Sequence, residues 1–196
     1  MKNLRDVIVL MCMGLFVSGA VTALAEDSDP ALLIGAKRCG MCHKKDLTGN
    51  QLAIWQAGPH AKAFELLASD EAKAVGAKLG IENPQQSGAC LKCHSTAYNG
   101  TEEVQNELIA VEDGVQCESC HGAGKNYKSK QIMEDRAQCI ENGMVYPATK
   151  SCAKCHNDAS PTWKPDRYTT KDGKPTGFDV EQAFDKIKHP NPAKAE

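Results

Sequence analysis

Aromatic and histidine side chains are scarce in this sequence. Phe, Tyr and Trp together make up 5% of its 196 residues, and only 6 residues are His. A chain of this length normally buries many large apolar side chains in its core, so an ordinary protein core is not expected here. The sequence contains 23 basic and 25 acidic residues and no basic stripe. That balance argues against a nucleic-acid partner.

Long apolar runs are absent beyond the N-terminus. Basic residues precede an apolar run over 7–16, and the small residues Ala23-Leu24-Ala25 follow it. This order is typical of a secretory signal with an A-x-A cleavage site. A retained membrane anchor is the alternative, but it needs about 18 uninterrupted apolar residues. We therefore expect residues 1–25 to be a cleaved signal peptide, and residues 26–196 to form one exported, periplasmic domain that is not an integral membrane protein.

One pentapeptide pattern, Cys-x-x-Cys-His, occurs four times, as CGMCH (39–43), CLKCH (90–94), CESCH (117–121) and CAKCH (152–156). In c-type haem attachment, two thiols add to the porphyrin vinyl groups and the following histidine binds the iron. A structural zinc site would need four converging ligands per metal and leaves the repeated histidine unexplained. A redox dithiol is expected once, near a βαβ unit of a cytosolic protein. The pattern therefore predicts four haems c, each containing iron.

The predicted roles follow from position in each motif. The residues expected to bind haem covalently are Cys39, Cys42, Cys90, Cys93, Cys117, Cys120, Cys152 and Cys155. The residues expected to be proximal ligands of the iron are His43, His94, His121 and His156. Because the haems would form much of the core, we expect the haem-free polypeptide to be unfolded.

The fold class predicted is mainly α, a small multihaem cytochrome with short helices and long loops packed around four covalently bound haems. Residues 59–80 read as helical, with Ser69 and Asp70 as candidate caps of a second segment that Gly80 ends. Residues 179–190 show an i, i+3, i+4, i+7 apolar stripe after a candidate N-cap at Asp179. Only "ELIAVE" (107–112) suggests a strand, and residues 169–177 read as a loop.

The histidine inventory limits the iron ligands. Four haems with two histidines each would need eight, and the chain has 6, of which four are proximal. His60 and His189 remain, and we expect both to be distal ligands because spare histidines are so few; a surface position is the alternative for each. Of the methionines, Met133 is favoured as a distal ligand, whereas Met144 is read as core filler. Cys139, outside the motifs, is read as a small buried residue.

Several segments together resemble the tetrahaem cytochrome c-554 family, and the resemblance spans nearly all of residues 33–190. The segments are "LIGAKRCGMCHKK", "HAKAF", "GVQCESCHGAGKNY", "CAKCHNDASPTWK" and "IKHP". The resemblance implies a mostly α-helical monomer with haems in close pairs, and a periplasmic role in moving electrons. In that pattern three haems have two histidine ligands and the second is five-coordinate and high-spin.

Carried over to this chain, the pattern makes His94 the proximal ligand of the open haem. It assigns His60 to the fourth haem, bound by His156, and His189 to the third haem, bound by His121. The family's ligand to the first haem is a histidine about ten residues beyond the third motif. The segment "GKNYKSKQIMED" has none, so Met133 is the hypothesis for the first haem, and a second open haem is the alternative.

The function predicted is electron transfer through four c-type haems between redox partners. The resemblance implies a donor like hydroxylamine oxidoreductase and an acceptor linked to quinone or another cytochrome, although the departure at Met133 leaves the donor open. The alternative is an enzyme that reduces nitric oxide or another small nitrogen oxide at the five-coordinate haem. All four motifs end in His, so no Lys-for-His variant of the nitrite-reductase kind is present. Gas sensing is a third hypothesis, which the lack of a signalling domain disfavours.

Overall fold

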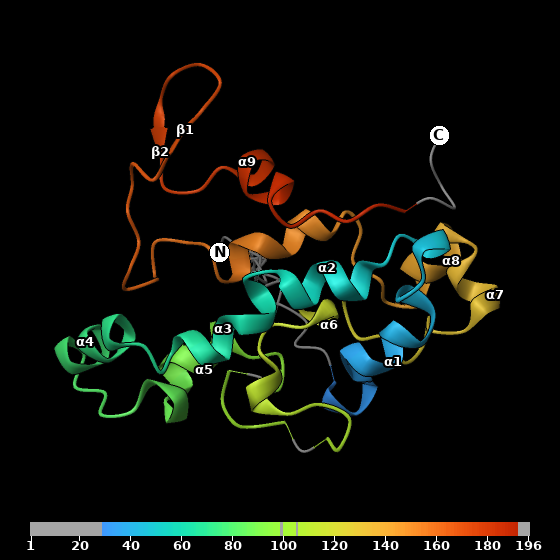
Figure 1. Ribbon diagram of the computed structural model, residues 1–196, viewed down its shortest axis with the longest axis horizontal. Coiled ribbons are helices and arrows are strands. Elements are labelled where there is room, and N and C mark those ends of the chain that lie inside the picture. The colour runs from blue at the N-terminus through green and yellow to red at the C-terminus, as the bar shows by residue number, and fades with distance from the viewer. Residues whose placement is uncertain (1–28, 99, 105, 192–196) are drawn as a thin grey trace, which may run out of the picture.

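The protein is described by a computed structural model that covers residues 29–98, 100–104 and 106–191. Over these residues the chain is mainly α, with short helices joined by loops (Figure 1). The predicted signal peptide, residues 1–25, lies outside the described residues. Across the described residues, no helix combines the length and the apolar character needed to span a bilayer.

The elements follow one another along the chain in short pieces. The α-helices are α1 (Gly35–His43), α2 (Gln51–Ala57), α3 (Ala63–Leu66), α4 (Asp70–Lys78), α5 (Gly88–His94), α6 (Cys117–His121), α7 (Lys130–Met133), α8 (Arg136–Glu141) and α9 (Val180–Asp185). The 3-10 helices are η1 (Pro30–Leu32), η2 (Asp46–Thr48), η3 (His60–Lys62), η4 (Pro84–Gln86), η5 (Val111–Asp113) and η6 (Ala148–Lys154). Strands β1 (Tyr168–Thr169) and β2 (Pro175–Thr176) form an antiparallel hairpin.

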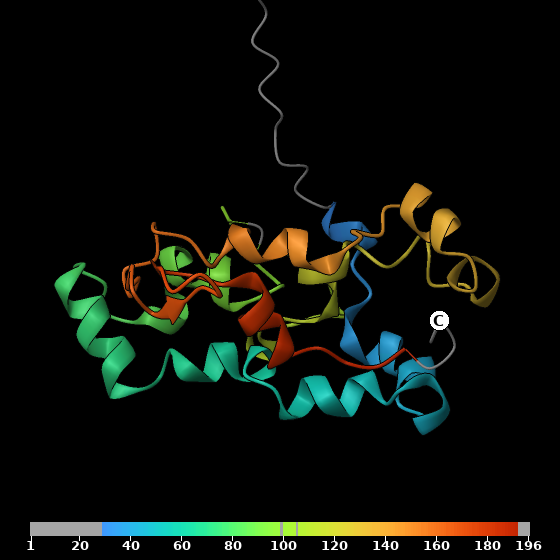
Figure 2. The ribbon, with the colours of Figure 1, turned by 90° about the horizontal axis from the view of Figure 1, so that it is seen from above.

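The helices form two rows, best seen from above (Figure 2). One row runs through α2, α3 and α4, and the other contains η6, α6 and α5, with α9 between the two rows. Contacts between α3 and α5 join the two rows directly, and α1 joins them by packing on both α2 and α6. Within the second row, α6 packs on η6. Helices α7 and α8 pack on each other at the end of the molecule opposite α4 (Figure 1).

The helical segment predicted over 59–80 forms as three pieces, η3, α3 and α4. The predicted cap at Ser69 is confirmed, because its hydroxyl accepts a hydrogen bond from the backbone N–H of Ala72 at 3.1 Å. Gly80 follows α4 with a φ of +70°, a left-handed conformation that glycine adopts without strain and that ends helices. The boundaries predicted from the sequence are therefore correct at this end.

Two other local predictions fail in part. Asp179 caps α9 as predicted, with its Oδ1 accepting from the N–H of Gln182 at 2.9 Å, but the helix ends at Asp185, well before residue 190. The strand predicted over 107–112 is wrong, since this segment turns into η5. The hairpin forms instead from Tyr168 to Thr176, in a stretch read as a loop, because Gly173 (φ +81°) supplies its reversal.

The core made by the protein itself is small. Eleven hydrophobic residues among the described ones are buried, and seven of them form one cluster: Leu33, Leu67, Leu91, Ala97, Val104, Ile109 and Val111. Cys139 is buried as predicted, with its thiol donating to the carbonyl of Ile132 at 3.2 Å. Two residues of the apolar stripe of α9, Val180 and Phe184, are 41% and 39% exposed.

A buried carboxylate joins the helix of the first motif to that of the third. Glu118, in α6, is 4% exposed. Its two oxygens accept hydrogen bonds from the backbone N–H groups of Ile34 (2.9 Å), Gly35 (2.8 Å) and Gly124 (2.7 Å). The first N–H groups of a helix have no partner within the helix, and a negative charge there is favourable. Glu118 thus caps α1 from a segment 83 residues away in sequence.

Helix α6 also connects to the other two motifs. The hydroxyl of Ser119 bonds that of Thr96 at 2.7 Å, and Thr96 lies two residues after the second motif. The hydroxyl of Ser151, in η6 just before the fourth motif, donates to the carbonyl of Cys120 at 3.1 Å. The other three motifs are therefore held against the five-residue helix α6, which is itself the third motif.

Replacement of Glu118 tests this central role. Glu118→Ala leaves buried N–H groups unsatisfied, which we expect to lower the free energy of unfolding by about 3 kcal/mol, and Glu118→Gln, which keeps one acceptor, by about half as much. The measurement is guanidinium unfolding followed by circular dichroism. The matched control is Glu134→Ala, which removes an exposed ion pair with Lys130 and is expected to cost at most about 0.5 kcal/mol. A Glu118→Ala protein as stable as the control would contradict this assignment.

Candidate functional site

Each Cys-x-x-Cys-His motif lies on a helical turn that ends at or next to its histidine. The first three motifs close α1, α5 and α6, whose last residues are His43, His94 and His121. The fourth continues from η6, where the N–H of His156 donates to the carbonyl of Cys152 at 2.9 Å. In every motif the two cysteines and the histidine of one pentapeptide therefore lie on the same helical turn.

The motif cysteines meet in pairs that join different motifs. None of the eight motif cysteines forms a disulfide within the described residues. A hydrogen bond with the thiol of Cys117, followed by burial, raises the pKa of Cys39. A hydrogen bond with the thiol of Cys93, again followed by burial, raises the pKa of Cys155. The first motif therefore lies beside the third, and the second beside the fourth.

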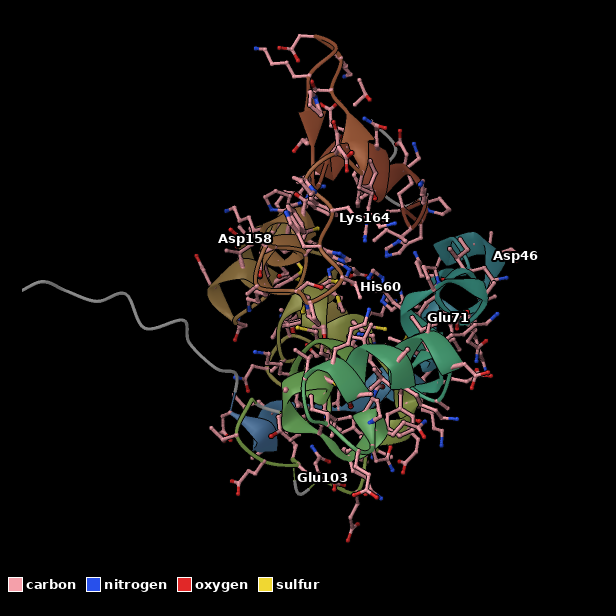
Figure 3. The ribbon with its side chains drawn as sticks, turned by 90° about the vertical axis from the view of Figure 1, so that its left-hand side faces the viewer. Asp46, His60, Glu71, Glu103, Asp158 and Lys164 are labelled. Atoms are coloured by element: carbon pink, nitrogen blue, oxygen red, sulfur yellow. The ribbon has the colours of Figure 1, made fainter. Side chains whose placement is uncertain are left out.

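His60 faces the histidine of the fourth motif. The ring centroids of His60 and His156 are 6.1 Å apart, and His60 lies in the middle of the molecule, whereas Asp46, Glu103 and Asp158 lie at its periphery (Figure 3). Burial, with a smaller effect of His156, lowers the pKa of His60. The ring is therefore neutral at neutral pH, which is the form that binds a metal.

His189 faces the histidine of the third motif. The ring centroids of His121 and His189 are 5.9 Å apart. Burial lowers the pKa of His121 to about 4, and His189 and His43 contribute less. Burial is also the main cause of the lowered pKa of His189. Both rings are thus neutral at neutral pH in the folded chain.

These separations fit a metal ion between two rings. Imidazole–metal bonds are about 2 Å long for zinc, and similar bonds on opposite sides of one iron atom leave the ring centroids roughly 6 Å apart. Over the described ranges, no group of three or more His, Cys, Asp or Glu side chains is placed to hold a metal ion. Two pairs of histidines meet, as they would on either side of a bis-histidine haem iron, and the residues present fit haem c.

The backbone around His60 is fixed by the segment before the third motif. The N–H of Val115 donates to the carbonyl of His60 at 3.0 Å, and the indole Nε1 of Trp55 donates to the carbonyl of Val115 at 2.8 Å. A Cβ at Gly114 would lie 2.9 Å from the carbonyl oxygens of both His60 and Ala61. Only glycine permits this close approach, so Gly114 helps to place the imidazole.

Hydrogen bonds fix the tautomers of two predicted proximal ligands. Nδ1 of His94 lies 2.7 Å from the carbonyl oxygen of Ala63. A carbonyl only accepts, so Nδ1 carries the proton and Nε2 keeps its lone pair. Nδ1 of His43 lies 3.2 Å from Oε1 of Gln51. Such hydrogen bonds orient metal-binding imidazoles and raise their basicity.

The ring of His156 is held differently. The ring of Phe178 stacks on it, with centroids 4.8 Å apart and planes inclined by 6°. The ring of Tyr168 meets Phe178 edge-on at 6.0 Å. The hairpin and the segment after it therefore orient the histidine of the fourth motif.

Met133 and Met144 stand apart from these pairs. Met133 is half-buried at the end of α7, and Met144, also half-buried, follows α8. The N–H of Met144 donates to the carbonyl of Cys139 at 2.9 Å. The bond predicted between Met133 and the iron held by His43 stays a prediction.

Gln51 and Glu118 could not be identified from the sequence, because each makes a contact with a segment far away along the chain. The same is true of Gln116, which is 3% exposed. Its Oε1 accepts from the N–H of Ala36 at 2.7 Å, while its Nε2 has no hydrogen-bond partner in the described part of the chain. Buried donors are almost always paired. A hydrogen-bond acceptor on a bound cofactor would suit the position next to Nε2 of Gln116.

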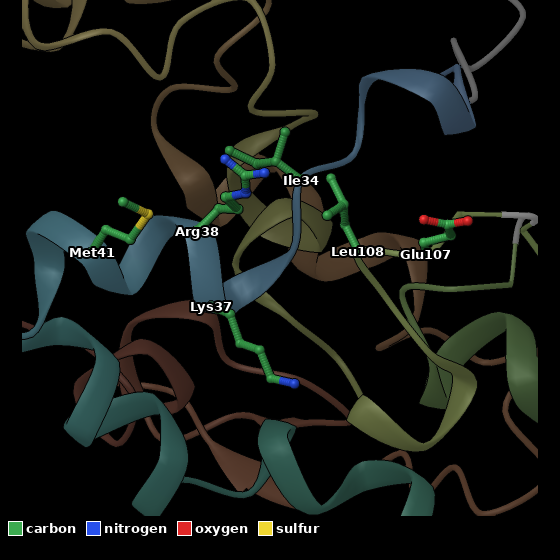
Figure 4. A pocket seen from close by; sticks show the side chains of 6 residues that line it. All are labelled: Ile34, Lys37, Arg38, Met41, Glu107 and Leu108. Atoms are coloured by element: carbon green, nitrogen blue, oxygen red, sulfur yellow. The ribbon is translucent and has the colours of Figure 1, made fainter.

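A pocket of about 320 Å³ lies beside α1 (Figure 4), lined by Ile34, Lys37, Arg38, Met41, Glu107 and Leu108. None of the predicted histidine ligands lines it. It is therefore separate from the histidine pairs that form the candidate site.

Comparison with known proteins points to one family. Residues 38–122 match the family described as cytochrome c554 and c-prime, a range that contains the first three motifs and His60. Cytochrome c-554 of Nitrosomonas europaea is 29% identical over 174 residues, which cover 79% of this chain and 69% of that protein. No solved structure gives a significant match.

Proposed function

Since this chain belongs to the cytochrome c-554 family, we propose that it is a periplasmic electron-transfer protein that holds four haems c. Membership makes it a c-type cytochrome with a role in electron transfer. When bound, haem c supplies an iron centre that gains and loses one electron. Beyond that role, we propose the number of haems, their iron ligands and the redox partners.

The facing histidine pairs carry the proposal. Two pairs, His60 with His156 and His121 with His189, have centroid separations of 6.1 and 5.9 Å, as bis-histidine iron requires. The chain has no further spare histidine. His60 would therefore be the distal ligand at the fourth motif, and His189 at the third.

The remaining two centres would differ from these. His43 would be the proximal ligand at the first motif with Met133 on the distal side, and His94 would hold a five-coordinate iron at the second. The eight motif cysteines would bind the porphyrins covalently. The thiol contacts support two close pairs of haems, one at the first and third motifs and one at the second and fourth.

The chain's own residues would keep the ligand geometry constant during electron transfer. Glu118 ties the first motif to the third, Ser151 ties the third to the fourth, and hydrogen bonds fix His43 and His94 in the tautomer that presents Nε2. Hydrogen bonds to the ligating imidazoles, together with burial and the identity of the axial ligands, tune haem potentials.

The partners we propose are a redox donor of the hydroxylamine oxidoreductase kind and a quinone- or cytochrome-linked acceptor. The protein would act as a monomer. Haem propionates would add negative charge to a chain that is already slightly acidic. A basic surface on a partner would then steer the encounter.

Removing the distal histidines tests the ligand assignment. His60→Ala and His189→Ala should each open one iron, so that carbon monoxide binding by the reduced protein rises by about one haem equivalent per chain. Added imidazole should reverse the gain, because it refills the vacant position. Optical titration with carbon monoxide measures the effect, and mass spectrometry checks that four haems are retained.

The matched control is Lys62→Ala, which changes an exposed residue of the same 3-10 helix. Its carbon monoxide binding should equal that of the wild type. Unchanged binding in both histidine variants, with four haems present, would show that the two residues are not ligands.

The two methionines provide a second test. Met133→His should lower one haem potential, because imidazole stabilises ferric iron more than a thioether does within an axial-ligand range of about 0.8 V. Met133→Ala should also change one potential, whereas Met144→Ala, the matched control, should change none. A redox titration that finds all potentials unchanged in both Met133 variants would eliminate Met133 as a ligand.

A further inference from the structure

A glutamine outside the four motifs lies against the histidine of the first. Gln51 is the first residue of α2, eight residues after His43. The chain reverses between them through η2 and the two residues that follow it, Gly49 (φ +98°) and Asn50 (φ +47°), which adopt left-handed conformations. This reversal places the start of α2 over the end of α1 and brings the Gln51 side chain to the imidazole.

Both ends of the Gln51 amide are engaged. Its Oε1 lies 3.2 Å from Nδ1 of His43. Its Nε2 donates to the carbonyl of Thr48 and, at 2.9 Å, to the carbonyl of Pro190. The two carbonyls can only accept, so they fix which end of the amide is nitrogen. The end that faces His43 is therefore the oxygen.

This orientation determines the state of the histidine. Because Oε1 accepts, Nδ1 of His43 must carry the proton and donate it. The lone pair of the neutral ring then lies on Nε2, the nitrogen left to bind iron. A hydrogen bond of this kind increases the basicity of the ligating nitrogen.

The hydrogen bond from Gln51 to Pro190 reaches the segment proposed to bind the haem at the third motif. Pro190 follows His189, the proposed distal ligand at the third motif, so Gln51 connects the proximal ligand of one centre to the distal segment of the next. The other pair has an equivalent connection. The carbonyl of Ala63 accepts from His94 and lies three residues after His60, the proposed distal ligand at the fourth motif.

We propose that Gln51 is a positioning residue that sets the reduction potential of the first haem through Nδ1 of His43 and braces the distal segment of the third. The proposal rests on the proposed function, since it requires a haem at Cys39 and Cys42. The acceptor on Nδ1 favours ferric iron, so its removal should raise the potential. Its replacement by a carboxylate should lower the potential.

The test compares two substitutions that differ at this one contact. Gln51→Met has a similar length but no acceptor, and Gln51→Glu keeps an acceptor and adds charge; both lose the Nε2 donor. In a spectroelectrochemical titration, Gln51→Met should shift one haem's oxidised-to-reduced ratio at fixed potential about tenfold toward the reduced form, the effect of one hydrogen bond. Gln51→Glu should shift the same haem the opposite way.

A purely structural role predicts something else. If Gln51 only braces the chain through Nε2, the two variants lose the same bonds and should shift in the same direction, which would overturn the proposal. Two variants with wild-type potentials would also overturn it. The matched control is Gln182→Met, which loses an exposed hydrogen bond to the carbonyl of Thr169 and should leave all potentials unchanged.

Mass spectrometry separates the two levels of failure. If the wild-type protein carries no haem at Cys39 and Cys42, the proposed function fails before any variant is compared. If the wild type and both Gln51 variants carry four haems, the shift in reduction potential tests the role of Gln51 alone.

Discussion

Helix α6 holds the three other motif segments in place. It is five residues long, yet its side chains and backbone hold the segments of all three other motifs. Glu118 satisfies the first N–H groups of α1, Ser119 bonds Thr96 beyond the second motif, and the carbonyl of Cys120 accepts from Ser151 before the fourth. A protein with so small an apolar core cannot rely on hydrophobic packing alone to hold four sites in register. The buried carboxylate of Glu118 and the part-buried hydroxyl groups of Ser119 and Ser151 supply that specificity.

The same architecture solves a shortage of imidazoles. With four histidines committed to the motifs, two remain, and the fold brings each to a different motif histidine. Both pairs are completed by segments far away in sequence, so the ligand geometry depends on the tertiary structure. In each proposed haem pair, a segment that bears a proposed distal histidine is also linked to the motif histidine of the neighbouring centre, through Gln51 in one case and Ala63 in the other.

Much of this could be predicted from the sequence, because the motif chemistry is local. Four Cys-x-x-Cys-His patterns, the mainly α class, and the caps at Ser69 and Asp179 depend on neighbouring residues. The false strand over 107–112 and the unexpected hairpin at Tyr168–Thr176 are short segments with little periodicity, where tertiary contacts override propensity. Glu118, Gln116 and Gln51 could not be found in advance, since nothing near them in sequence identifies a partner 80 or more residues away.

Low-temperature paramagnetic resonance of the oxidised wild-type protein, with its spin signals quantified per chain, tests the proposed iron ligands. We expect two low-spin haems with two imidazole ligands each, from the pairs at His121 and His156, together with high-spin iron from the centre at His94. Three or more bis-imidazole haems, or none, would contradict these assignments.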